Sequence, residues 1–127
     1  MIQFNIIIFN EQSHSTINAI KDRLVMFINY NIIVITDYAE FKDRFTSCLA
    51  GECIIIFFIN NEKDMVFLEL MKKYFMDIKL IIYLSFENKD IISRAYAMYP
   101  RMVISDDSSK ELLPAVIEKI AKNLIKQ

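Results

Sequence analysis

The chain has 127 residues, of which 54% are hydrophobic and 24% are charged, and its formal net charge is -1. This length and composition indicate a single globular domain over residues 1–127 and exclude a disordered chain. The balanced charge gives no signature of nucleic-acid binding, and the single glycine excludes both the P-loop and the dinucleotide-binding motif, which need several glycines.

The segment "MIQFNIIIFNEQ" at the start of the chain lacks the basic region and the small-residue cleavage site of a signal peptide. No apolar run approaches the roughly 18 residues that a membrane-spanning helix needs. The two cysteines, Cys48 and Cys53, form no CxxC pair and no cluster with histidine, which indicates reduced core cysteines. We therefore expect a cytoplasmic protein with no membrane partner, no metal and no cofactor.

Five isoleucine-rich apolar runs are predicted to be β-strands. They are continuous and do not alternate with polar residues, which is typical of parallel strands covered on both faces. The runs are Phe4–Phe9, Asn31–Ile35, Cys53–Ile59, Leu80–Leu84 and Met102–Ile104.

The segments that follow the strands carry apolar residues at helical spacing. The five predicted inward faces are Ile17, Ile20, Leu24 and Ile28; Phe41, Phe45, Cys48 and Leu49; Phe67, Leu70, Met71, Tyr74 and Phe75; Ile91, Ala95, Met98 and Tyr99; and Leu113, Val116, Ile117, Ile120 and Leu124. Capping residues predict the helix starts at Ser13 or Ser15, at Asp37, at Asn60 or Asn61, at Glu87 or Asn88, and at Ser108 or Ser109.

Strands and helices thus alternate five times, which predicts a (βα)5 α/β fold, a doubly wound parallel sheet. Right-handed crossovers favour the strand order 2-1-3-4-5, with a functional crevice at the carboxyl ends of the strands. The residues expected there are Asn10, Glu11, Asp37, Asn60, Asn61, Ser85, Ser105, Asp106 and Asp107.

Over its whole length the chain resembles the receiver domain of bacterial response regulators, which has this flavodoxin-like (CheY-like) fold. The resemblance lies in the length, the (βα)5 order and the spacing of the strands. The ending "RMVISDDSSKELLPAVIEKI" is similar to the last strand and helix of receivers from the NarL/FixJ branch, the LuxR-type transcription regulators.

A receiver of this family uses a small set of strand-end groups for phosphorylation. Two acidic residues after the first strand hold Mg²⁺, an aspartate ending the third strand is the nucleophile, and a Ser or Thr and a Lys end the fourth and fifth strands. The matching positions in this chain are Asn10 and Glu11 for the acidic pair, Phe57, Phe58 or Asn60 for the nucleophile, Ser85 for the Ser or Thr, and Ser105 for the Lys.

The resemblance therefore implies a pseudo-receiver that keeps the fold but has lost phosphorylation. Its degenerate phosphorylation pocket consists of Asn10, Glu11, Asn60, Ser85 and Ser105, and no catalytic or enzymatic activity is expected. Asp64 is an alternative, displaced phospho-acceptor, but its place after the third strand favours an acid in the first turn of a helix. Asp106 and Asp107 similarly favour a helix cap over a metal pair.

Several apolar residues fall outside the predicted inward faces of the helices, and methionines among them suit an adaptable contact surface. They are Met26, Phe27, Met65, Met76, Ile92, Tyr96, Leu112 and Ile125. Receivers of this branch pair through the first and fifth helices, or through the fourth helix, fifth strand and fifth helix, so the resemblance implies a homodimer.

The favoured hypothesis is a phosphorylation-independent regulatory and dimerisation module of a LuxR-type regulator, which binds DNA only through a C-terminal domain absent from this chain. One alternative is a stand-alone adaptor or anti-regulator that binds another signalling protein, a partner regulator. Another is a small-ligand sensor that uses the strand-end crevice.

Overall fold

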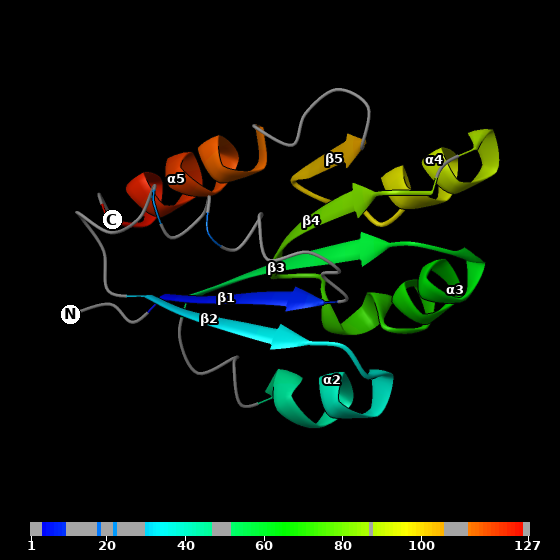
Figure 1. Ribbon diagram of the computed structural model, residues 1–127, viewed down its shortest axis with the longest axis horizontal. Coiled ribbons are helices and arrows are strands. Elements are labelled where there is room, and N and C mark those ends of the chain that lie inside the picture. The colour runs from blue at the N-terminus through cyan, green and yellow to red at the C-terminus, as the bar shows by residue number, and fades with distance from the viewer. Residues whose placement is uncertain are drawn as a thin grey trace.

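The computed structural model describes residues 4–9, 18, 22, 30–46, 52–86, 88–105 and 112–125. Its five strands form one parallel sheet in the order β2-β1-β3-β4-β5, so the predicted fold and strand order are confirmed (Figure 1). The strands are β1 Phe4–Phe9, β2 Tyr30–Ile35, β3 Glu52–Ile59, β4 Lys79–Leu84 and β5 Met102–Ser105.

The described helices follow the strands, as predicted. They are α2 Tyr38–Phe45, α3 Glu62–Leu70, α4 Lys89–Tyr96 and α5 Leu112–Ile125, and a short 3₁₀ turn, η2 Lys72–Tyr74, comes after α3. The predicted first helix lies outside the described residues, except for Asn18 and Asp22, which are both helical. No helix in the described part of the chain is long and apolar enough to cross a membrane.

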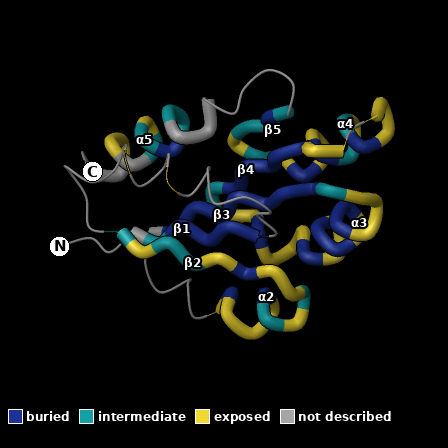
Figure 2. The backbone as a smooth tube through the Cα atoms, in the orientation of Figure 1, coloured by how far each residue is buried: buried dark blue, intermediate teal, exposed yellow. Residues whose placement is uncertain are grey.

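The sheet has a hydrophobic core on each face, because successive side chains of a strand point to opposite sides. On one face Phe9, Phe57 and Ile82 pack against α2, α3 and α4. On the other face Ile8, Phe58 and Tyr83 pack on the side of α5, whose Ile117 belongs to the same cluster. The central strands are accordingly buried along nearly their whole length (Figure 2).

Side-chain caps start three of the helices at predicted residues. Asp37 accepts hydrogen bonds from the backbone N–H groups of Ala39 and Glu40 at the start of α2. Asn61 accepts from Asp64 N at the start of α3, and Asn88 accepts from Ile91 N at the start of α4. Each cap satisfies amide groups that a helix leaves without a partner in its first turn. The caps fix where each helix leaves the end of its strand.

Two of the predicted inward faces are partly wrong. In the third, Phe67, Met71 and Phe75 are buried, but Leu70 and Tyr74 are exposed. The buried side of α3 is formed by Asp64, Met65, Phe67 and Leu68, and Leu70 does not belong to it. Tyr74 lies in η2, beyond the end of the α-helix, where the chain no longer follows the spacing of 3.6 residues per turn. Met65 is fully buried and does not belong to the predicted surface set.

Tyr99 was expected on the inward face of the fourth helix and is instead 86% exposed. The helix α4 ends at Tyr96, and Tyr99 has a left-handed backbone with φ 53°, which turns its side chain out of the helical series. Ile92, expected on the surface, is half-buried and packs against the core, whereas Tyr96 is exposed as predicted. Met26 and Phe27 lie outside the described residues, as do the side chains of Leu112 and Ile125.

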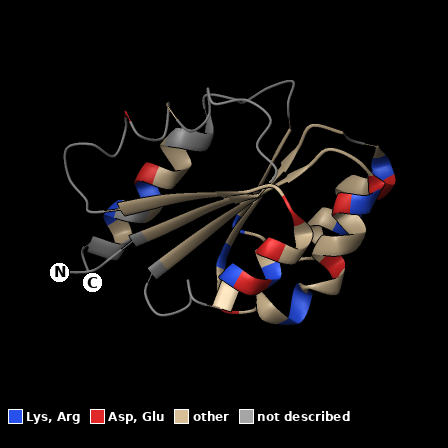
Figure 3. Cartoon of the chain, turned by 60° about the horizontal axis from the view of Figure 1, so that its bottom comes forward, with Lys and Arg blue, Asp and Glu red and all other residues tan. Residues whose placement is uncertain are grey.

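A network of ion pairs joins α3 to α4. The guanidinium of Arg94 on α4 contacts the carboxylates of Glu62 at 2.6 Å and Asp90 at 3.1 Å, and Glu69 at 3.0 Å through Nε. The hydrogen bonds from Glu69 and then Glu62 raise the pKa of Arg94 above its ordinary value, so its charge is permanent. As Figure 3 shows, such charged residues lie mainly on the helices, and the sheet is almost free of them.

Candidate functional site

The candidate site lies at the carboxyl ends of β3 and β4, where Asn60 and Ser85 follow the last pair of the ladder, Ile59 and Leu84. The single proton of the Ser85 hydroxyl faces two acceptors, the carbonyl oxygen of Ile59 at 3.1 Å and Oδ1 of Asn60. The backbone N–H groups of Ser85 and Phe86 donate to the same carbonyl oxygen at 3.1 and 3.2 Å. The turn after β4 is therefore fixed against the end of β3, with Asn60 and Ser85 in contact.

A buried carboxylate lies directly beside this pair. Asp64 is only 1% exposed and is the one buried charged side chain among the described residues. Its Oδ1 accepts a hydrogen bond from the Tyr38 hydroxyl at 2.5 Å, and its Oδ2 accepts from the backbone N–H of Asn60 at 2.9 Å. Burial, together with the hydrogen bond to Asp64 and its charge, raises the pKa of Tyr38 from 10.0 to about 12.

These contacts give Asp64 a structural position that joins three segments of the chain. Tyr38 is the first residue of α2, Asn60 follows β3, and Asp64 itself lies in the first turn of α3, as predicted. Because both of its oxygens already accept hydrogen bonds, the carboxylate is oriented into the protein and not toward an incoming phosphoryl group. The geometry therefore favours the helix acid over the displaced phospho-acceptor.

Of the three candidates for the nucleophile position, Asn60 is the one at the strand end. Phe57 is buried in the core on the side of α2 and α3, where it stacks on Phe9 with ring centroids 4.4 Å apart. Phe58 is buried in the opposite core and stacks on Tyr83 at 4.7 Å. Neither ring reaches Ser85, since each points into a face of the sheet.

The remaining predicted pocket residues are only partly placed. Ser105 is the last residue of β5 and pairs with Leu84, so it lies on the strand next to Ser85. Asn10 and Glu11 lie outside the described residues, as do Asp106 and Asp107. Within the described ranges, no three His, Cys, Asp or Glu side chains come together in a way that could hold a metal ion.

The role of Tyr38 was not predicted from the sequence. Its position directly after the helix cap Asp37 gives no hint that its hydroxyl reaches a residue 26 positions away. A weak signal existed for Asp64, which comes three residues after the cap Asn61, the spacing at which an acidic side chain can turn back to a preceding backbone N–H. Here it reaches Asn60, the residue before the cap.

Comparison with known proteins gives a structural likeness and no sequence family. No protein-family model matches the chain, and no curated protein matches it in sequence. The RcsB response regulator of Salmonella typhimurium has a TM-score of 0.67 at 16% identity, covering 97% of this chain and 62% of its own. This chain therefore spans less than two thirds of RcsB.

Two further solved structures match over nearly their whole length. The phosphorylated cyanobacterial phytochrome response regulator RcpA has a TM-score of 0.66 at 16% identity, covering 92% of this chain and 91% of its own. The receiver domain of the putative response regulator NarL from Mycobacterium tuberculosis has a TM-score of 0.63 at 10% identity, covering 96% and 98%. At these identities the likeness establishes the fold, and that fold is the one found in response-regulator receiver domains.

Proposed function

We propose that the chain is a pseudo-receiver, a regulatory module that acts by protein contact and without phosphorylation. The observation that carries the proposal is the amide of Asn60 at the end of β3, hydrogen-bonded to the hydroxyl of Ser85. In receiver domains the corresponding contact is made between a phosphorylated aspartate and a Ser or Thr. Here the hydroxyl of Ser85 meets a neutral amide oxygen instead.

The chemistry of the side chains supports the loss of phosphoryl transfer. An amide has no carboxylate oxygen to attack phosphorus, so Asn60 cannot become an acyl phosphate. Glu11 would be the only carboxylate of the magnesium pair, and Ser105 carries no charge to pair with a phosphoryl group. Asp64 does not replace the nucleophile, because Tyr38 and Asn60 hold both of its oxygens.

The proposed context is a homodimeric transcription regulator of the LuxR type, in the cytoplasm. Support comes from the similarity of the last strand and helix to that branch, and from the fold shared with RcsB, which is also described in complex with DNA. In this proposal DNA contacts belong to a further domain outside these 127 residues, since the net charge of -1 gives no whole-chain signature of nucleic-acid binding.

Incubation with acetyl phosphate and Mg²⁺ tests the loss of phosphorylation. We expect no mass increase by intact-protein mass spectrometry, and no change in the amide NMR signals of residues 60 and 85 when beryllofluoride is added. Stoichiometric phosphorylation of the natural chain would contradict the proposal.

The matched variant is Asn60→Asp, which restores a carboxylate beside Ser85. An aspartate can still accept the hydrogen bond from the Ser85 hydroxyl, so the fold should be retained. A phosphoryl group on this variant alone would show that Asn60 occupies the place of the nucleophile. Labelling of the natural chain and the variant at equal levels would instead point to another acceptor.

A further inference from the structure

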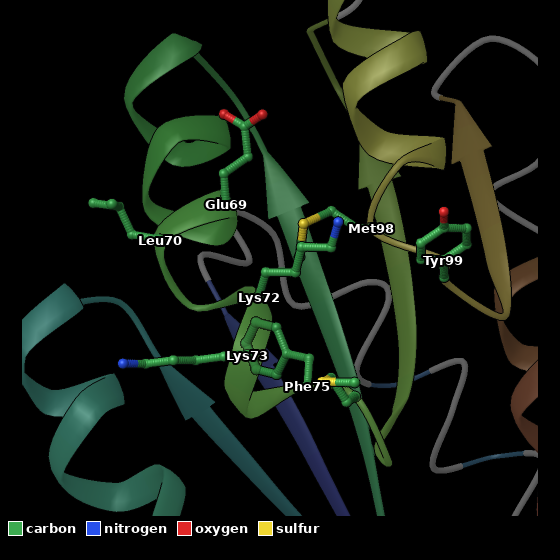
Figure 4. A pocket seen from close by; sticks show the side chains of 8 residues that line it. Glu69, Leu70, Lys72, Lys73, Phe75, Met98 and Tyr99 are labelled. Carbon is green, nitrogen blue, oxygen red and sulfur yellow. The ribbon is translucent and has the colours of Figure 1, made fainter.

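A pocket of about 540 Å³ lies between the C-terminal part of α3 and the segment that follows α4 (Figure 4). In a parallel α/β sheet each helix runs back against the direction of the strands, so helix C-termini lie at the end opposite the strand-end crevice. The pocket is therefore at the other end of the sheet from Asn60 and Ser85. Nothing in the proposed receiver-like site accounts for it.

The walls of the pocket are mainly apolar, and several of its side chains extend into solvent. Phe75 and Met98 are buried, whereas Leu70, Met76 and Tyr99 are exposed by 73%, 81% and 86%. These three are the most exposed large hydrophobic side chains among the described residues. A group of exposed apolar side chains around a hollow is typical of a surface that binds another molecule.

The charge of the pocket is positive. Lys72 and Lys73 line it and are exposed, and Glu69 is the one acidic side chain among its described lining residues. The carboxylate of Glu69 is held by the guanidinium of Arg94, which contacts both of its oxygens. The two lysines therefore remain as the charges that an approaching partner meets, and they attract acidic groups.

Tyr99 is held at the pocket in an unfavourable backbone conformation. Its φ of 53° is in the left-handed region, where glycine or asparagine is preferred and a bulky residue is strained. The exposed ring of Tyr99 contributes little to the core. It does contact Lys72, whose Nζ lies 5.3 Å from the centroid of the ring, a distance typical of a cation–π interaction. Strain of this kind is concentrated at functional surfaces.

We propose that this pocket is a docking site for an acidic amphipathic helix of a partner protein. The apolar face of such a helix would fill the hollow and cover Leu70, Met76 and Tyr99, and its acidic residues would face Lys72 and Lys73. A small ligand inside the hollow would leave the projecting side chains in water, so the exposed area favours a polypeptide. The inference rests on the proposed function only in that a module acting by contact requires a partner.

Titration with a synthetic peptide tests the docking site. The probe is a short amphipathic helical peptide with leucines on one face and glutamates on both flanks, compared with the same peptide carrying lysine for every glutamate. We expect the acidic peptide to shift the amide NMR signals of residues 69–76 and 98–99, with an affinity that falls as salt is added. Failure of the acidic peptide to bind, or equal binding of the lysine peptide, would overturn the proposal.

Two variants separate binding from folding. Tyr99→Gly removes the ring and relieves the left-handed strain, so its urea midpoint should be at least that of the natural chain while peptide binding weakens about tenfold. The double variant Lys72→Glu and Lys73→Glu should weaken binding to a similar extent by reversing the charge. The controls are Tyr96→Ala and Lys63→Glu, an aromatic and a lysine that do not line the pocket, and both should bind normally.

The remaining outcomes would each contradict an acidic helix as the occupant. Equal losses in the control variants would mean that the peptide binds elsewhere. Shifts of the pocket signals by decanoate, without binding of the peptide, would identify a small-molecule site. Dissociation of a dimer by Tyr99→Gly, again without peptide binding, would identify a second copy of the chain. None of these results depends on acetyl phosphate labelling, so the two proposals fail separately.

Discussion

At the scale of single residues, the end of β3 is fixed by two adjoining sets of hydrogen bonds. The side chain of Asn60 meets Ser85, while its backbone N–H is held by Asp64, which in turn is bonded to Tyr38. A carboxylate that is 1% exposed is tolerated only where hydrogen bonds replace those of water. The strand end is therefore held in one arrangement by hydrogen bonds between side chains and backbone, which supports the proposed function.

The Tyr38 hydroxyl gives a direct test of this arrangement. Tyr38→Phe keeps the ring, which stacks on Phe67 at 4.4 Å, but leaves Oδ1 of the buried Asp64 without that donor. We expect a loss of about 1–3 kcal/mol in the free energy of unfolding, measured by urea denaturation. The control Tyr74→Phe removes the hydroxyl of a half-exposed tyrosine and should change stability by less than about 0.5 kcal/mol.

The raised pKa of Tyr38 predicts how the difference in free energy of unfolding between the natural chain and Tyr38→Phe depends on pH. In the folded protein the Tyr38 hydroxyl keeps its proton up to about pH 12. In the unfolded chain the same hydroxyl loses its proton near pH 10.0. The stabilisation is therefore complete below pH 10 and is lost as the pH rises through 12. Urea titrations between pH 10 and pH 12 should show the free energy of unfolding of the natural chain falling toward that of Tyr38→Phe. A difference independent of pH would show that the hydroxyl does not act through this hydrogen bond.

At the scale of elements, α3 and α4 are connected by the side chain of Arg94. It is 22% exposed and is shared among Glu62, Glu69 and Asp90, the first two of which lie on α3. A network with a partly buried guanidinium contributes more than an isolated surface pair, because the geometry is fixed from several sides. Glu69 also lines the pocket, so its ion pair with Arg94 offsets a negative charge at the pocket wall.

Arg94→Met should lower the free energy of unfolding by about 1 kcal/mol, and the loss should become smaller in high salt as the charges are screened. The matched control is Arg44→Met, which removes the surface ion pair with Glu40, whose side chains are 47% and 44% exposed, and should cost at most about 0.5 kcal/mol. Urea unfolding at low and high salt measures both. Equal costs for the two variants would mean that the network adds nothing beyond a surface pair.

At the scale of the whole molecule, the sheet could be predicted because its signal is long and redundant. Runs such as Cys53–Ile59 contain more consecutive apolar residues than a half-exposed strand, in which polar residues alternate with apolar ones. The right-handed crossovers then leave few possible strand orders, of which the observed order is one. The helix starts at Asp37 and Asn88 were predictable for a local reason, since a capping side chain bonds to amides two or three residues away.

Features that depend on contacts between distant segments could not be predicted. The bond from Tyr38 to Asp64 and the contact of Asn60 with Ser85 each join residues at least 25 positions apart. The exposure of Tyr74 follows from the change to η2 after the end of α3, and no glycine or proline in the sequence marks that end. Sequence periodicity thus specifies the layers, and tertiary packing decides which residues of each helix stay outside them.

Association of the whole molecule is the remaining prediction, and α4 gives it a specific form. Tyr96 is 59% exposed, and Ile92, one turn before it, is half-buried. These two side chains form an apolar strip on the surface of α4. We expect a dimer at micromolar concentration through the face of α4, β5 and α5, measured by sedimentation. Tyr96→Glu should then yield monomers, because it places a charge in an apolar contact.

Val66→Glu is the matched control, since it adds the same charge at an exposed apolar position on α3, and it should remain dimeric. A natural chain that stays monomeric at high concentration would remove the dimerisation module from the proposed function. A dimer unaffected by Tyr96→Glu would instead place the contact on the first and fifth helices.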